Sequence, residues 1–94
     1  MKKGVYSIFD NKACVFNSPF TAHTDAEAER TLSDGIKNMD SVLGHNPQDF
    51  ALFRIGDFDC ISGQLSGLPS PIHIAHGSQF LPRTSVISKV AEVD

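Results

Sequence analysis

The run Phe50-Ala51-Leu52-Phe53-Arg54-Ile55 decides the fold. Aromatic and β-branched side chains dominate it, which is typical of a β-strand. Side chains alternate between the two faces of a strand, and in this run apolar groups fall on both faces. A strand that is apolar on both sides indicates a central position, so we expect neighbouring strands along both of its edges.

The residues before it predict an N-terminal hairpin. Val5–Phe9 and Ala13–Phe16 are expected as strands, and Asp10–Lys12 has the residue types of a tight turn. Pro19 interrupts the second strand, and Phe20–His23 is expected to extend it along an edge.

One helix is expected between the hairpin and the central strand. Thr24 and Glu27 have the spacing of a capping box, in which each side chain accepts a hydrogen bond from a backbone N–H group at the helix start. The helix is predicted from Asp25 to Lys37 or Met39. Its apolar stripe consists of Ala28, Leu32, Ile36 and Met39.

After the central strand, Asp57–Asp59 is expected to lead into a turn. Glycine and proline then predict a loop-rich connection through residues 62–71, and Ile72–His76 is expected as the last strand. The order strand-strand-helix-strand-strand predicts an α+β domain, a small antiparallel sheet with one helix packed on one face. We expect a single domain over residues 1–81 and a C-terminal tail over residues 82–94.

Length and composition describe a small protein. The chain has 94 residues, so its core is thin, and self-association into a homo-oligomer is one alternative. Its two cysteines, Cys14 and Cys60, can form at most one disulfide, and reduced, part-buried thiols are the preferred interpretation. No signal peptide or membrane span is expected, because the apolar run near the N-terminus ends at Asp10.

The charge pattern argues against a nonspecific DNA binder. The formal net charge is −3, and phosphate binding normally needs a basic face. The basic residues are scattered, unless folding or oligomerisation gathers them. They are Lys2, Lys3, Lys12, Arg30, Lys37, Arg54, Arg83 and Lys89.

No catalytic residue, metal ligand or cofactor site is predicted, so we expect a binding protein and not an enzyme. Nucleotide loops and hydrolase motifs are absent from the sequence. His73 and His76 are expected on opposite faces of a strand, which disfavours a metal site with them. Asp57 and Asp59 share a strand face, but a solvated acidic turn is the preferred interpretation.

The eight aromatic residues allow a stacking platform for single-stranded nucleic acid. A small domain needs most of them in its core. Tyr6, Phe16 and Phe20 are therefore the candidates for the surface.

Several stretches together resemble the small non-structural protein of gokushoviruses, which are single-stranded DNA phages of the microvirus family. The resemblance covers about residues 5–81 and is most specific over Pro47–Asp59. It rests on Val5–Ala13, Pro19-Phe20, His45–Asp59, Gly63, and Pro71-Ile72 leading to Phe80.

The resemblance implies a protein made in the cytoplasm of the infected bacterium and absent from the mature virion. It is likened to the coliphage switch protein that acts when replication turns to single-strand synthesis and packaging. The implied partners are the viral replication complex, procapsid proteins or viral DNA. A single-stranded DNA-binding protein proper and a host-directed interaction module are the alternatives. The candidate nucleic-acid contacts are Lys2, Lys3, Lys12, Arg54 and Tyr6.

Overall fold

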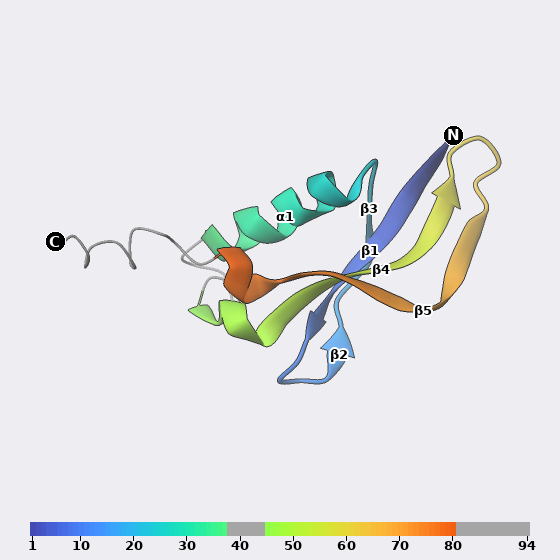
Figure 1. The fold of residues 1–94 in the computed structure, drawn as a ribbon. Helices are drawn as coiled ribbons and strands as arrows, with labels where there is room; N and C mark the ends of the chain where they lie inside the picture. The colour runs from blue at the N-terminus through green and yellow to red at the C-terminus, as the bar shows by residue number, and fades with distance from the viewer. Residues whose placement is uncertain (38–44, 81–94) are drawn as a thin grey trace, which may run out of the picture.

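The computed structural model describes residues 1–37 and 45–80, in which one α-helix packs against a five-stranded antiparallel sheet (Figure 1). The predicted α+β class is confirmed. The strands are β1 (Lys2–Asp10), β2 (Val15–Phe16), β3 (Phe20–Ala22), β4 (Phe50–Asp59) and β5 (Leu65–His76). The helix α1 spans Asp25–Lys37, and the 3-10 helices are η1 (Pro47–Asp49) and η2 (Gly77–Phe80).

The centre of the sheet consists of β1 and β4, which pair from Lys2 opposite Asp59 to Asp10 opposite Phe50. On the far side of β4 lies β5, which confirms a central position for β4. Both β2 and β3 pair with β1. The second strand expected from the sequence is therefore divided in two, and the observed order is three strands, the helix and two strands.

Several predicted strand ends are wrong. β1 begins at Lys2 and not at Val5, and β2 begins at Val15 and not at Ala13. β4 continues to Asp59 and does not stop at Ile55, and β5 begins at Leu65, seven residues before Ile72. The ladder has Arg54 opposite Ile72 but Gly56 opposite Gly67, so residues 68–71 face Ile55 alone. The prolines of that segment fall where the ladder is irregular and on an edge strand, which is where a strand tolerates proline.

The start of α1 follows the predicted capping pattern closely. The Glu27 N–H donates to Thr24 Oγ1 (3.1 Å). Glu27 Oε1 in turn accepts from the N–H of His23 (2.9 Å), one residue before the cap itself. The helix is described as far as Lys37, and the other predicted end, Met39, lies outside the described residues.

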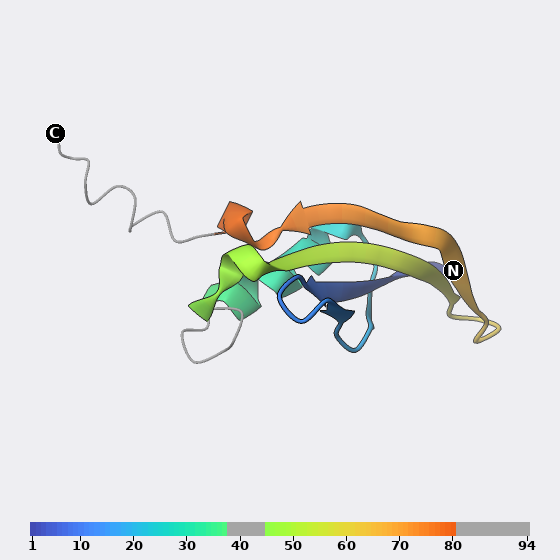
Figure 2. The same ribbon diagram turned by 90° about the horizontal axis from the view of Figure 1, so that it is seen from below.

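The core lies between α1 and one face of the sheet. Its buried members are Tyr6, Ala22, Ala28, Leu32, Ile36, Leu52 and Ala75. Burying a side chain of leucine size contributes about 1.5–3 kcal/mol, so this layer holds the helix in place. Figure 2 shows α1 behind the strands, and Figure 1 shows the N-terminal end of β1 and the β4–β5 turn projecting beyond it.

The predicted tail, residues 82–94, lies outside the described residues. Among the helices that the structure does describe, none has the length and apolar character needed to cross a membrane.

Candidate binding surface

An aromatic cluster lies on the sheet face away from α1, which we call the open face. Phe9 and Phe16 face each other across β1 and β2, with ring centroids 4.8 Å apart. Phe53 lies 5.6 Å from Phe16 and 6.1 Å from Phe9, and His73 lies 5.3 Å from Phe53. Phe16 is 44% exposed, and His73 is exposed as well. The aromatic cluster therefore presents ring surface to solvent.

A bulge in β5 completes this surface. His73 pairs with Phe53 and His76 with Ala51, so three steps along β5 match two steps along β4. Both histidines consequently lie on the open face, and the prediction that they point to opposite faces is wrong. A regular strand would have separated them.

The aromatic cluster borders a hollow of about 290 Å³, close to the lower limit for small-ligand sites. Its walls are mainly aromatic, and Asn11, Asp49 and His76 contribute polar groups. Since the Ser78 N–H donates to Nδ1 of His76 (3.1 Å), the neutral ring carries its proton on Nε2. The full lining is Phe9, Asn11, Asp49, Phe50, Ala51, Phe53, His73 and His76.

Further along the open face, a second and more apolar hollow of about 250 Å³ begins at Val5. Val5 and Phe9 are both open-face residues of β1, four positions and about 13 Å apart. The second hollow is lined by Val5, Pro19, Ile55, Gly56, Leu65, Ser66 and Gly67. Ser7 lies between Val5 and Phe9 on this face and donates its hydroxyl to the Asn17 carbonyl (2.6 Å), so the two hollows are separate apolar parts of the open face.

Two of the predicted contact residues lie on the helix side. Tyr6 is 1% exposed, so its predicted place at the surface is wrong. Its hydroxyl donates to Asp25 Oδ1 (2.5 Å), and burial followed by this bond raises the pKa of Tyr6 to about 12. Arg54 is opposite Tyr6 and forms an ion pair with Asp57, which raises the pKa of Arg54. Neither side chain belongs to the open face.

The three predicted lysines are spread along β1. Lys2 and Lys3 lie at its N-terminal end, while Lys12 lies in the turn beyond Asp10. The two ends of β1 are about 26 Å apart, so these three lysines do not form a compact basic patch. Alternation places Lys3 on the open face together with Val5 and Phe9.

Negative charge is concentrated in the other layer. The helix α1 carries Asp25, Glu27, Glu29 and Asp34 against Arg30 and Lys37. The open-face positions of β1, in contrast, contain one cation and no carboxylate. β1 therefore adds no negative charge to the open face, and the hollow on that face contains the carboxylate of Asp49.

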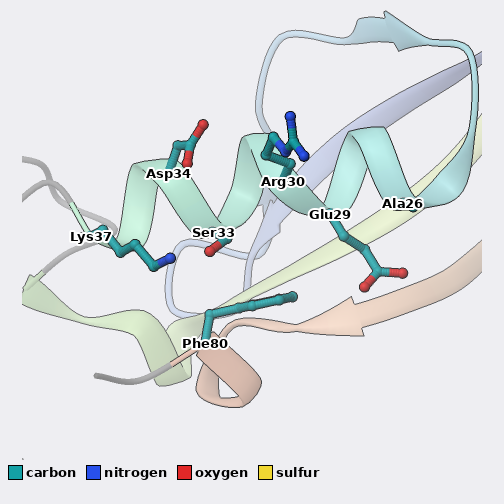
Figure 3. Close-up of a pocket in the computed structure, with 7 residues that line it drawn as sticks. All are labelled: Ala26, Glu29, Arg30, Ser33, Asp34, Lys37 and Phe80. Carbon is teal, nitrogen blue, oxygen red and sulfur yellow. The ribbon is translucent and has the colours of Figure 1, made fainter. Parts of the chain in front are cut away.

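A groove of about 370 Å³ runs between α1 and Phe80 of η2 (Figure 3). Arg30 and Asp34 point away from Phe80, and the lining also includes Glu29 and Lys37. Opposite charges alternate along the helix and do not converge on one point. The groove is therefore a weaker candidate than the open face.

The prediction of a solvated acidic turn is wrong for Asp57 and Asp59, because both are half-buried residues of β4. Asp57 pairs with Arg54, and the Asp59 carboxylate accepts N–H bonds from Ile61 and Ser62, which lower the pKa of Asp59. Cys14 and Cys60 are free thiols, and Cys14 is exposed, not part-buried as predicted. Within residues 1–37 and 45–80, no group of three or more histidine, cysteine or acidic side chains has a metal-binding arrangement.

Sequence reasoning missed Phe9 and Phe53 as half-buried residues of an open sheet face, whereas His73 was expected at a surface or interface. The sequence did contain a signal for such a face. The central strand is apolar on both faces, and a single helix can cover only one face of the sheet.

Fold and surface together define a small α+β domain with an uncovered aromatic sheet face. A family described as phage ORF5 protein matches residues 3–80, and the chain belongs to this family. No match was found among curated proteins or among solved structures.

Proposed function

We propose that the chain is a phage accessory protein of viral DNA replication and single-strand packaging, and that it acts by binding through its open face. Membership of the phage ORF5 family supports the phage role. The resemblance to the gokushovirus non-structural protein supports the finer assignment to a single-stranded DNA microvirus and to the switch from duplex copying to packaging.

The observation that carries the binding role is the aromatic cluster on the open face. Apolar groups that remain contiguous on a small protein's surface mark interaction sites. Phe16 stays 44% exposed although the domain has a thin core and few aromatic side chains to spare. A ring that stays this exposed adds little to the stability of the fold, so its position is better explained by binding.

The proposal is tested in infected bacteria. A phage carrying Phe16→Ser in this gene is compared with one carrying Ile61→Ser, which alters an 84% exposed residue in the β4–β5 turn. We expect Phe16→Ser to leave duplex viral DNA abundant and to reduce packaged single strands, while Ile61→Ser behaves as wild type. Normal amounts of both DNA forms with Phe16→Ser would contradict the proposal.

The same proposal places the protein in the host cytoplasm and outside the virion. Quantitative mass spectrometry of lysates and of purified virions measures this directly. We expect its peptides in lysates alone, and a fixed copy number per virion would contradict this placement.

A further inference from the structure

We infer that the open face binds single-stranded nucleic acid, with a base in the hollow beside the aromatic cluster and the strand lying along β1. This inference rests on the proposed function, since it names what the binding surface holds. It follows from three features of that face: its ring surfaces, its polar rim and its charges.

The first feature is the aromatic ring surface around the hollow. Phe9, Phe53 and His73 form walls of the hollow, and Phe16 lies beside them with its ring partly exposed. Every base has a π-face, so stacking on aromatic side chains binds single strands with little sequence preference. In a duplex the bases already stack on each other, so this surface favours unpaired DNA.

The polar rim argues for a base over a purely apolar occupant. Asn11, Asp49 and His76 line the hollow together with the rings. The edges of bases carry hydrogen-bond donors and acceptors that match amide, carboxylate and imidazole groups. A second copy of this chain, packed sheet against sheet, would bury the same three groups and lose their bonds to water.

Positive charges near the two ends of β1 suit a phosphate backbone. Lys12 lies in the turn beyond the hollow, and Lys3 lies on the open face near the other end of β1. Among the described residues, α1 carries much of the negative charge and Asp57 pairs with Arg54, whereas Asp49 lines the hollow and lies with Asp10 beside Lys12. Two cations give modest electrostatic affinity, so stacking dominates and the salt dependence is shallow.

The test is fluorescence anisotropy with a labelled single strand of roughly 12 nucleotides, within the range that small folds cover. Phe16→Ala and His73→Ala should each weaken binding roughly 5- to 150-fold, which corresponds to the loss of one stacked base. Lys3→Gln and Lys12→Gln should each reduce the slope of log affinity against log salt concentration by about 0.7. Ile61→Ser is the matched control for an exposed apolar residue, and it should bind as wild type.

Absence of binding at low salt, equal affinity for duplex DNA, or equal losses with Ile61→Ser would each overturn the inference. Solution mass then separates the two proposals. If the protein is a dimer that Phe16→Ala dissociates, and if it does not bind DNA, the open face is a contact between copies and this inference is overturned. The infected-cell experiment still decides the proposed function in that case. Strand binding by the purified protein supports the inference even where the viral DNA forms stay normal.

Discussion

The ring of Phe53 lies edge-on to the imidazole of His73, with centroids 5.3 Å apart and planes at 82°. This contact joins β4 to β5 on the open face, at the register shift between Leu52 and Phe53. Edge-to-face pairs contribute about 0.5–1.5 kcal/mol beyond the area they bury. The aromatic cluster is therefore built into the sheet ladder and is not a chance gathering of surface rings.

Phe53→Ala should cost more stability than Phe16→Ala. Phe53 contacts three other rings and is half-buried, so we expect a loss of about 2–3 kcal/mol, below the range for a fully buried phenylalanine. Phe16 is 44% exposed, so Phe16→Ala should lower the free energy of unfolding by about 1 kcal/mol or less. Urea unfolding measures both, and equal losses would mean that the cluster does not have the burial described here.

Gly77→Ala should be strongly destabilising. A Cβ atom at Gly77 would lie 2.0 Å from the Pro47 carbonyl oxygen, where η2 packs against η1. Backbone atoms cannot move aside easily, so we expect a loss of about 3 kcal/mol. Gly67→Ala is the matched control, because nothing lies within 4 Å of its Cβ position, and its stability should change little. Similar melting temperatures for the two variants would contradict the packing of η1 and η2.

Thr24→Ala should lower the free energy of unfolding by about 1 kcal/mol, because the Glu27 N–H at the start of α1 loses its acceptor. Thr31→Ala serves as the control, since Thr31 is exposed on the same helix and should change stability by less than about 0.5 kcal/mol. Thermal unfolding by circular dichroism compares them. The capping pattern would be refuted by a Thr24→Ala variant as stable as Thr31→Ala.

The burial of the Tyr6 hydroxyl and its hydrogen bond to Asp25 predict a pH dependence of stability. The pKa of Tyr6 is about 12 in the folded protein against 10.0 for the free side chain, so the unfolded chain ionises first as the pH rises. The stabilisation is complete below about pH 10 and is lost as the pH rises through about 12. Tyr6→Phe removes this contribution, so the wild type should be more stable at about pH 9, and the difference should shrink toward pH 12. A difference that stays constant over this range would contradict the assignment.

The helix was predictable because its signals are local. Thr24 and Glu27 occupy capping positions, and the apolar stripe has a single period, so distant residues were not needed to place α1. The central position of β4 was equally visible in the alternation of residues 50–55.

The long β4–β5 ladder was not predictable from local signals. Gly56 and the prolines at 69 and 71 indicate breaks. Pairing with β1 keeps β4 continuous, and the irregular register with β4 lets β5 continue past its prolines. The same non-local pairing creates the bulge that brings His73 and His76 to one face. Tyr6 was misplaced because its partner, Asp25, belongs to an element 19 residues away.

The central claim is that the open face, and not α1, contacts single-stranded DNA. An NMR titration of the ¹⁵N-labelled full chain with the 12-nucleotide strand tests it residue by residue. The account predicts shifts at the amides of Phe9, Phe16, Phe53 and His73, with those of Glu29 and Asp34 on α1 unchanged. Shifts confined to α1, or no shifts at saturating DNA, would contradict it.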